Sequence, residues 1–341
     1  MKITYLVGAG ASAKALPIVS QIADRVTTMI SYLSDAKLAM TGHYEKEYKM
    51  GGNVLSKEDI KVFFVEDLNW LQVIAKSHAS IDTYAKKLFL RGDNKNLKKL
   101  KLVFSTYLFL EQSLNKVDMR YDSFFASILN DTINSFPKNI RIISWNYDFQ
   151  FEKSYSEYTE NSNIQFNQSY LNVATYYNNR FLLSGGFKII KLNGTTDFTE
   201  NNNNNLHQFD NKMQDSLTAQ NLSAVLEKYY LLRLDSTEYR INLAFAWEQT
   251  KDSEDSSLSI AINETKDTEV LVVIGYSFPY FNREIDRSIL KSMTSLKKVY
   301  FQSPDAGKIK ERFLSVRSDI QDSYLYERTN TDQFLLPDEL D

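Results

Sequence analysis

The sequence predicts an α/β fold in which a doubly wound, mostly parallel sheet carries an inserted helical subdomain. Short apolar runs without polar alternation are typical of strands that are buried on both faces of a parallel sheet. Segments with helical spacing separate these runs. The region between the first two runs is far longer than the roughly thirty residues of a plain strand–helix–strand unit, which indicates an insertion. The five predicted strands cover residues 3–7, 141–145, 187–192, 269–275 and 297–301.

The intervening segments follow the same logic. Helical spacing begins after Pro17 and continues to about Ser34, and residues 56–135 form a block of amphipathic helices. We expect residues 150–185 to be irregular with short strands, because they are polar and rich in tyrosine and asparagine. Further helices are expected over 215–232 and 239–248, and the strand at 297–301 is expected to be the last.

Composition narrows the class of protein. The chain has 341 residues, of which 43% are hydrophobic and 24% charged, as in ordinary globular proteins. No apolar run reaches the roughly 18 residues of a membrane span, and no basic leader with a cleavage site is visible, so we expect a cytoplasmic protein. A net charge of −3 argues against a nucleic-acid-binding surface.

The sequence has no cysteine and only three histidines, namely His43, His78 and His207. Disulfides, thiolate nucleophiles and cysteine-based zinc sites are therefore excluded. Three scattered histidines are too few for a tetrahedral zinc site, so we expect no metal.

A glycine-rich turn follows the first predicted strand, with the sequence Gly8-Ala9-Gly10-Ala11-Ser12. A strand, a glycine turn and a helix together point backbone N–H groups at a phosphate. Gly8 permits the tight turn, Gly10 lets the backbone approach a pyrophosphate, and Ala13 packs helix on strand. The pattern predicts a Rossmann-like dinucleotide site. A glycine turn that binds nothing is the alternative.

Polar residues also end three other predicted strands, at 146–148, 193–195 and 275–277. Ligands of open α/β sheets bind beyond the carboxyl ends of the strands. Four strand ends therefore predict one shared cavity.

These segments, in this order, resemble the motifs of the sirtuin-like NAD-binding superfamily from Met1 to about Gln302. The glycine turn with Pro17 resembles its N-terminal signature, and Ser144-Trp-Asn146-Tyr-Asp148 is similar to its central motif. Residues 191–195 occupy the place of its Lys-Leu-His-Gly-Ser, and residues 275–278 with Asn282 and Asp286 resemble its ribose-contacting loop. The resemblance implies the catalytic residues Asn146, Asp148 and Asn193 and the NAD-binding residues Gly8, Ala9, Gly10, Ala11, Ser12, Pro17, Gly194, Gly275, Ser277 and Asp286.

The chain lacks the four-cysteine zinc module and the Pro-x-Phe-Arg motif of protein-deacylating sirtuins. It resembles instead the zinc-free bacterial branch, whose members hydrolyse NAD in antiphage defence. This resemblance implies an NAD+ glycohydrolase that takes NAD as substrate, forms a homo-oligomer and works with a partner such as a HerA-type ATPase, a short Argonaute or a sensor domain. It implies an NAD-binding domain over 1–34 and 136–310, a helical insertion over 35–135 and a C-terminal segment over 311–341.

The chemistry expected of the site is simple. Cleavage of the glycosidic bond of NAD passes through an oxocarbenium-like ribose, and nicotinamide leaves without a strong acid. The Asn146 amide can bind a hydroxyl or the attacking water, and Asp148 can offer negative charge to the cationic ribose. Both residue types also favour strand-end turns, which is the alternative interpretation.

Asn193 departs from the family, because an amide cannot accept a proton as the family histidine does. Either hydrolysis is weak, another group substitutes, or the protein is an inactive NAD-binding scaffold. His207 could reach the site, although a solvated loop histidine is the favoured interpretation. The neighbours His78, Ser80 and Asp82 are interpreted as structural.

One further segment stays open at this stage. Asp118, Arg120 and Tyr121 come just before a predicted helix. They could contact NAD or a neighbouring subunit.

Overall fold

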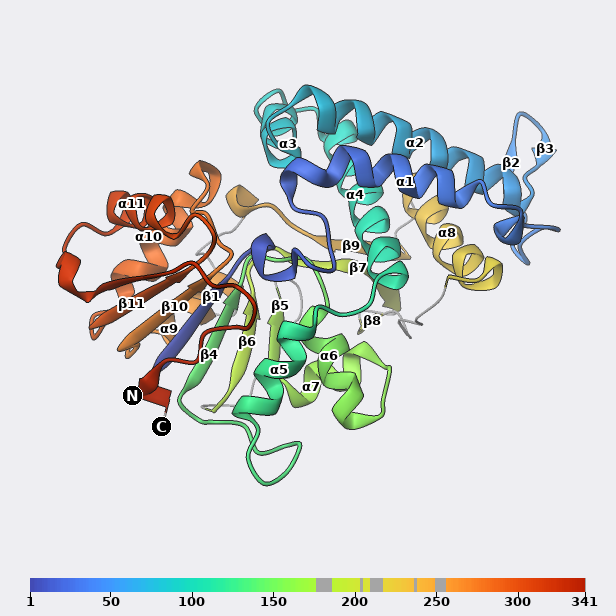
Figure 1. Ribbon diagram of the computed structural model, residues 1–341. Coiled ribbons are helices and arrows are strands. Elements are labelled where there is room, and N and C mark those ends of the chain that lie inside the picture. Colours follow the sequence, from blue (N-terminus) through green and yellow to red (C-terminus); the bar gives the residue numbers. More distant parts are fainter. Residues whose placement is uncertain (176–185, 203–204, 209–216, 236–237, 249–255, 341) are drawn as a thin grey trace.

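The computed structural model describes residues 1–175, 186–202, 205–208, 217–235, 238–248 and 256–340. Within them, seven strands form one sheet in the order β12-β11-β10-β1-β4-β6-β5, and every neighbouring pair is parallel. Figure 1 shows this sheet beside a separate layer of helices. The predicted α/β fold with a parallel sheet is therefore confirmed. The strands are β1 (Ile3–Val7), β4 (Ile140–Ser144), β5 (Val173–Thr175), β6 (Lys188–Lys191), β10 (Val270–Ile274), β11 (Lys298–Gln302) and β12 (Leu325–Arg328).

The central strand β1 lies between β4 and β10, with Tyr5 in register with Ile142 on one side and Val272 on the other. The chain leaves β1 toward β4 and returns later to β10, so the direction of winding reverses beside β1. Such a reversal opens a crevice at the carboxyl ends of the two strands on either side of it. The glycine turn leaves β1 at this point.

Helices cover both faces of the sheet. Side chains alternate along β1, so Tyr5 packs on one face with α5 and α6 while Leu6 packs on the other with α9, α10 and α11. The sheet is thus doubly wound, as predicted. The helices on the first face are α5 (Met119–Ile128), α6 (Gln150–Thr159) and α7 (Ile164–Tyr170), and those on the second are α9 (Ser257–Glu264), α10 (Arg283–Ser292) and α11 (Ala306–Val316).

A second body, which we call the helical lobe, packs beside the sheet's carboxyl edge (Figure 1). It has its own apolar core, to which Val26, Phe64, Leu110, Leu226 and Leu243 contribute. The lobe consists of α1 (Ile22–Leu33), α2 (Lys57–Ser77), α3 (Ile81–Leu90), α4 (Asn94–Leu114), α8 (Ala219–Arg233) and a small antiparallel sheet in the order β8-β7-β9. The strands of that sheet are β7 (Gly194–Asn202), β8 (Asn205–Gln208) and β9 (Tyr239–Leu243).

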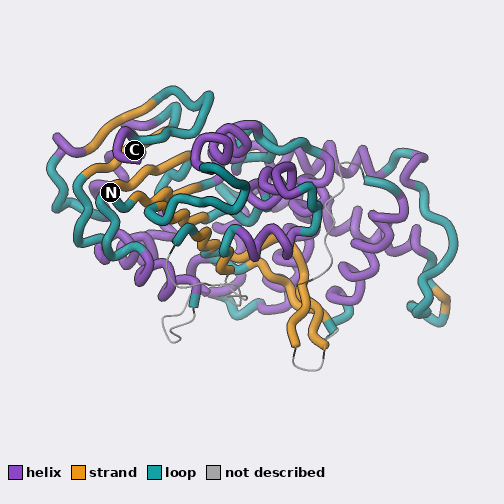
Figure 2. The backbone as a smooth tube through the Cα atoms, turned by 90° about the horizontal axis from the view of Figure 1, so that it is seen from below, coloured by secondary structure: helices purple, strands orange, loops and turns teal. Residues whose placement is uncertain are grey.

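The lobe is assembled from two distant parts of the chain. The apolar face of α1 packs against α2, and α8 packs against α2 and α4. Neither α1 nor α8 lies in the 35–135 segment in which the helical insertion was expected. A two-stranded hairpin, β2 (Lys49–Met50) with β3 (Asn53–Val54), lies at the end of the lobe far from both termini (Figure 2).

Several element predictions were wrong. Helix α1 begins at Ile22, after a 3-10 turn over Val19–Gln21, instead of at Pro17. The segment expected to be irregular contains α6 and α7, and the helix expected over 239–248 is strand β9 followed by a 3-10 turn. Strand β12 follows the strand expected to be last. Pairing with neighbouring strands overrides weak local preference in β9 and β12. The 3-10 turn after β9 covers Ala246–Glu248. The other 3-10 turns are Ala9–Ser12, Ala36–Leu38, Tyr280–Asn282, Asp322–Tyr324 and Asp338–Leu340.

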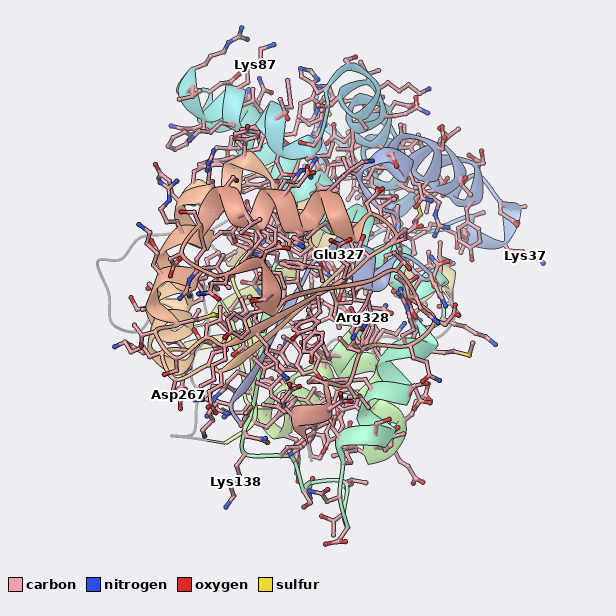
Figure 3. All side chains as sticks on the ribbon, turned by 60° about the vertical axis from the view of Figure 1, so that its left-hand side comes forward. Lys37, Lys87, Lys138, Asp267, Glu327 and Arg328 are labelled. Atoms are coloured by element: carbon pink, nitrogen blue, oxygen red, sulfur yellow. The ribbon has the colours of Figure 1, made fainter. Side chains whose placement is uncertain are left out.

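Lys37, Lys87, Lys138 and Asp267 are examples of charged side chains on the outside of the molecule (Figure 3). Among the helices that the structure describes, none combines the length and the apolarity that crossing a membrane requires.

Candidate functional site

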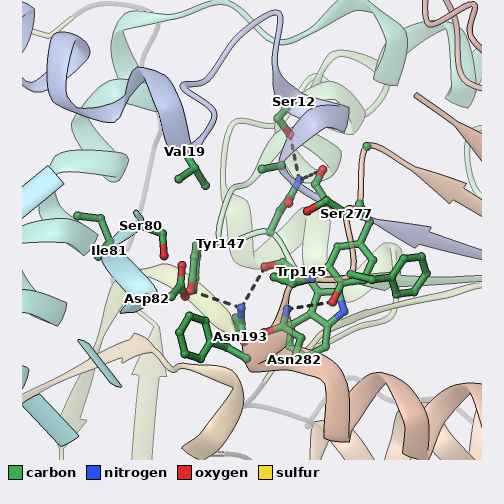
Figure 4. Close-up of a pocket in the computed structure, with 18 of the residues that line it drawn as sticks. Ser12, Val19, Ser80, Ile81, Asp82, Trp145, Tyr147, Asn193, Ser277 and Asn282 are labelled. Carbon is green, nitrogen blue, oxygen red and sulfur yellow. Dashed lines mark hydrogen bonds between the residues drawn. The ribbon is translucent and has the colours of Figure 1, made fainter. Parts of the chain in front are cut away.

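A cavity of about 680 Å³ lies between the carboxyl ends of β1, β4 and β10 and the helical lobe (Figure 4). This is the crevice that the reversal of winding beside β1 creates. The sheet side supplies the turns after these strands, including Gly8, Asn146 and Gly275, and the lobe supplies Asp82 and Gln112. The volume suits a nucleotide-sized ligand.

The cavity brings most of the sequence-predicted site residues together. Those that line it are Gly8, Ala9, Ser12, Pro17, Asn146, Asp148, Asn193, Gly275 and Ser277. Four others, namely Gly10, Ala11, Gly194 and Asp286, do not line it.

The glycines hold two loops against each other. A Cβ atom on Gly10 would lie 2.8 Å from the Gly275 Cα, and one on Gly275 would lie 2.3 Å from the Ala11 nitrogen. Gly275 also has a φ of +58°, which favours glycine. Gly10 was predicted to let the backbone approach a pyrophosphate. In the structure, the absence of a side chain at Gly10 lets the backbone of Gly275 pack against it. Gly194 is needed for a similar reason, because its Cβ would lie 1.9 Å from the Asn242 carbonyl oxygen.

Ser12 is the centre of the polar network at the sheet edge. Its hydroxyl donates to Asp148 Oδ2 at 2.7 Å and accepts from Asn146 Nδ2 at 3.2 Å. Since the single hydroxyl proton goes to Asp148, the Tyr121 hydroxyl, 2.8 Å away, must donate to Ser12. The Asn146 amide also donates to the Gly8 carbonyl at 3.1 Å. Its Oδ1 accepts no hydrogen bond from the described residues and stays available to a ligand.

Asp148 is a buried carboxylate under opposing influences. Burial raises its pKa, whereas the Lys191 charge and the hydrogen bond from Ser12 lower it, and the net pKa lies above the usual value. Lys191 donates to the Asp148 backbone carbonyl at 2.6 Å and forms a buried ion pair with Glu152. Lys191 thus fixes the loop after β4 from beneath the cavity.

Asn193 lies at the end of β6 with its amide nitrogen turned inward. Nδ2 donates to the Trp145 carbonyl at 3.3 Å and to the Tyr147 hydroxyl at 3.4 Å. Its Oδ1 is buried and has no hydrogen-bond partner among the described residues. A buried acceptor without a partner costs free energy, because it has lost its hydrogen bonds to water. A hydrogen-bond donor on a ligand in the cavity would remove this cost.

Asp82 is a functional candidate that the sequence interpretation missed. It lies in the first turn of α3 and lines the cavity, together with Ser80, while His78 remains outside as the residue that ends α2. Asp82 accepts a hydrogen bond from Tyr147, and burial raises its pKa to about 6. Ser80 caps α3, accepting from the Thr83 N–H at 3.1 Å. A capped helix start was visible in the sequence, but its position over the sheet edge was not.

Asp286 stands behind the cavity wall. Its two oxygens accept from Trp145 Nε1 at 3.2 Å and from the Tyr276 hydroxyl at 2.8 Å. The two rings are stacked with centroids 5.9 Å apart, and both line the cavity. Burial raises the pKa of Asp286 to about 8. The position of Asp286 supports a role in orienting these rings, where the sequence predicted contact with the ligand.

The segment of Asp118 and Arg120 supports the glycine turn from outside the cavity. Arg120 Nη2 donates to the Ala11 carbonyl at 2.9 Å and pairs with Asp118 at 2.6 Å, and both side chains are buried. Arg120 thereby satisfies a carbonyl that the tight turn leaves unpaired.

Two arginines bring positive charge to the cavity, and one of them, Arg312, contacts the loop after β10. Arg283 begins α10 and Arg312 lies on α11, and both line the cavity. Among the described residues neither forms an ion pair; they donate instead to the backbone carbonyls of Ser315 and Ser277, each at 2.9 Å. Their charge is available to an anionic ligand.

The described residues contain no cluster of three or more histidine, cysteine, aspartate or glutamate side chains that could hold a metal ion. The side chain of His207, which lies on β8, falls outside the described part of the structure.

The fold and the cavity define a doubly wound α/β protein with a cavity at its switch point. No family model and no curated protein matches the sequence. Among solved structures, a Sir2 homologue mutant in complex with 2'-O-acetyl ADP ribose has 12% identity and a TM-score of 0.40, over 97% of this chain and 86% of its own. A Sir2 homologue in complex with NAD has 11% identity and a TM-score of 0.37, over 94% of this chain and 90% of its own. Sir2Tm bound to a propionylated peptide has 12% identity and a TM-score of 0.35, over 97% and 88%. Likenesses this distant say nothing of what this chain binds, which rests on its own side chains.

Proposed function

We propose that the cavity binds NAD and hydrolyses the bond between nicotinamide and ribose. One observation carries the proposal: Asn146, Asp148 and Asn193, from the ends of two strands, converge on one cavity beside the glycine turn. These are the residues on which the sequence resembles sirtuin-like NAD-binding proteins. The positive charge of Arg283 and Arg312 suits the pyrophosphate of this dinucleotide.

The reaction follows from the groups present. A water oxygen forms a bond to ribose C1', the bond from C1' to the ring nitrogen breaks, and its electron pair stays with neutral nicotinamide. Asp148, in its ionised form, stabilises the positive charge that develops on the ribose. The free Oδ1 atoms of Asn146 and Asn193 accept hydrogen bonds from ribose hydroxyls or from the attacking water. One proton of the water must leave to a base or to solvent.

Incubation of the purified protein with NAD, with nicotinamide release followed by chromatography, tests this function. We expect release from the parent and none from Asn146→Ala. Loss of activity by unfolding is detected by the melting temperature, since the Asn146 amide also bonds Gly8 and Ser12. Absence of nicotinamide release from the folded parent, alone and with its genomic neighbour, would refute hydrolysis.

Calorimetry tests binding separately. Arg312→Gln is expected to weaken NAD binding about tenfold, because it removes a charge from the cavity. Arg287→Gln is the matched control, since Arg287 is an exposed residue of α10 that does not line the cavity. Equal affinity of Arg312→Gln and the control would remove Arg312 from the NAD site.

A second candidate function rests on Asn193. An amide cannot take a proton at neutral pH, so the protein could serve as an inactive NAD-binding scaffold. Binding without release in the two experiments above identifies this case. In either case the resemblance favours a cytoplasmic antiphage-defence protein that oligomerises and is activated by a partner such as a HerA-type ATPase. Coexpression with the adjacent genes tests that assignment.

A further inference from the structure

The cavity holds a second carboxylate, which the reaction above does not use. Asp82 comes from α3 of the helical lobe, whereas Asn146, Asp148 and Asn193 come from the sheet. Figure 4 shows Asp82, Tyr147 and Asn193 side by side at one wall of the cavity. The lobe thus places an acidic group next to the position at which the chain lacks a histidine.

Tyr147 links Asp82 to Asn193. The Asn193 amide donates to the Tyr147 oxygen at 3.4 Å, so the Tyr147 hydroxyl proton points to the Asp82 carboxylate, with which it is hydrogen-bonded. Asn193 cannot take a proton, and its Oδ1 can only hold a donor in place. The nearest group in this chain of hydrogen bonds that can accept a proton is Asp82.

Asp148 is less suited to the same task. Both of its oxygens already accept hydrogen bonds, from the Ser12 hydroxyl and from the Gln150 N–H, and Lys191 stabilises its negative charge. These contacts suit a fixed charge that faces the ribose. Asp82 accepts from its own backbone N–H and from Tyr147, and no cation is among the groups that act on it.

We propose that, in the NAD hydrolysis proposed above, Asp82 is the general base that replaces the missing histidine. As the water oxygen bonds to ribose C1' and nicotinamide leaves with the electron pair of the broken bond, one water proton passes to an Asp82 oxygen. Asp82 later releases this proton to solvent. The protein then needs its helical lobe for the chemistry and not for folding alone.

The ionisable groups that face Asp82 are Tyr147, from the loop after β4, and Tyr276, from the loop after β10, while Glu248 acts on Tyr147. Burial raises the pKa of both tyrosines well above 10, so they stay neutral near pH 7. Burial raises the pKa of Asp82 to about 6, which leaves it mostly ionised at pH 7 and close to the value that favours a general base.

The experiment compares Asp82→Asn with the parent in kcat between pH 5 and 9 and in the dissociation constant for NAD. General-base assistance is worth about 10²- to 10⁴-fold, so we expect kcat to fall by that factor while NAD affinity stays within about twofold. The acidic limb of the kcat profile, expected near pH 6, should disappear. Asp24→Asn is the matched control, because Asp24 lies in the first turn of a lobe helix, is exposed and does not line the cavity.

Two further variants make the test independent of the stability of Asp82→Asn. The Tyr147 hydrogen bond lowers the pKa of Asp82, so Tyr147→Phe should move the acidic limb to higher pH. Adding Asn193→His to Asp82→Asn should restore part of kcat, because it supplies a base from the neighbouring position.

The outcomes separate the two proposals. Unchanged kcat and an unchanged acidic limb in Asp82→Asn overturn the role of Asp82 and leave NAD hydrolysis standing. Loss of NAD binding in this variant also overturns it, since Asp82 would then hold the substrate. No nicotinamide release from the parent removes the hydrolysis and the base together.

Discussion

The Ser12 hydroxyl donates a 2.7 Å hydrogen bond to the Asp148 carboxylate, across 136 positions of sequence. This contact joins the glycine turn after β1 to the loop after β4. It satisfies a buried carboxylate that lines the cavity, and it lowers the pKa of that carboxylate against the larger effect of burial.

Ser12→Ala is expected to raise the pKa of Asp148, because the hydrogen bond from Ser12 lowers it and burial then acts with less opposition. The acidic limb of nicotinamide release should move to higher pH, and stability should decrease by about 1 kcal/mol. A pH profile of kcat with a denaturant titration measures both. Ser20→Ala, at an exposed position, is the control. An unshifted profile would separate Asp148 from the reaction.

The glycine turn offers two variants that separate folding from binding. Gly275→Ala places a Cβ against the backbone of Gly10 and Ala11 at a positive φ, so we expect a loss of more than about 2 kcal/mol in stability. Ala9→Leu enlarges an exposed side chain that lines the cavity, and should weaken NAD binding tenfold or more at an unchanged melting temperature. Unaltered NAD affinity in Ala9→Leu would show that the ligand does not cover this turn.

Asp286 predicts a pH dependence of stability. Burial raises its pKa from 3.8 to about 8, so between these values the folded protein keeps a proton that the unfolded chain has lost. The stability that this group contributes is therefore complete at low pH and is lost as the pH rises toward 8. Asp286→Asn lacks this titration.

Denaturant titrations of both proteins at pH 5 and pH 8.5 measure the effect. We expect the difference in unfolding free energy, parent minus variant, to become smaller at the higher pH. A difference that stays constant between pH 5 and pH 8.5 would mean that Asp286 is already ionised in the folded protein at pH 5.

Asn193→His tests the position at which this chain has an asparagine and sirtuin-like proteins have a histidine. An imidazole there adds a proton acceptor beside Trp145 and Tyr147, so we expect faster nicotinamide release with similar NAD affinity. Single-turnover kinetics separates the chemical step from product release. If the variant binds NAD normally and neither it nor the parent releases nicotinamide, even with a partner present, the scaffold function replaces the hydrolase.

Local patterns predicted five of the seven strands of the parallel sheet and the sheet side of the cavity, whereas β5 and β12 were not predicted as separate strands. Strands such as β1 and β10 are buried on both faces, so they are short, continuous apolar runs. Their length, their β-branched residues and the turn residues that follow them favour a strand over a helix segment. Polar residues after such runs lie at one edge whatever the connections are, because parallel strands end on the same side. Asn146, Asp148 and Asn193 could thus be grouped without coordinates.

The lobe could not be derived in this way. An amphipathic pattern predicts that α1 and α8 each have an apolar face, but it does not predict which helices pack against that face. Strand β9 has weak local preference and is held by pairing with β7. These outcomes depend on contacts between segments far apart in sequence, which a local window does not contain.

The sequence by itself determined the order of the strands' apolar runs, the glycine turn and the identity of the residues at the strand ends, because each depends on neighbours within one element. Only the tertiary structure decided that Gly10 and Gly275 must both lack a side chain because their backbones pack against each other. It also decided that Asp286 lies behind the cavity wall and that Asp82 lines the cavity. Each of these facts depends on contacts between segments that are far apart in the sequence. The packing of the lobe on the sheet edge places Asp82, and the packing of the loops after β1 and β10 places the two glycines.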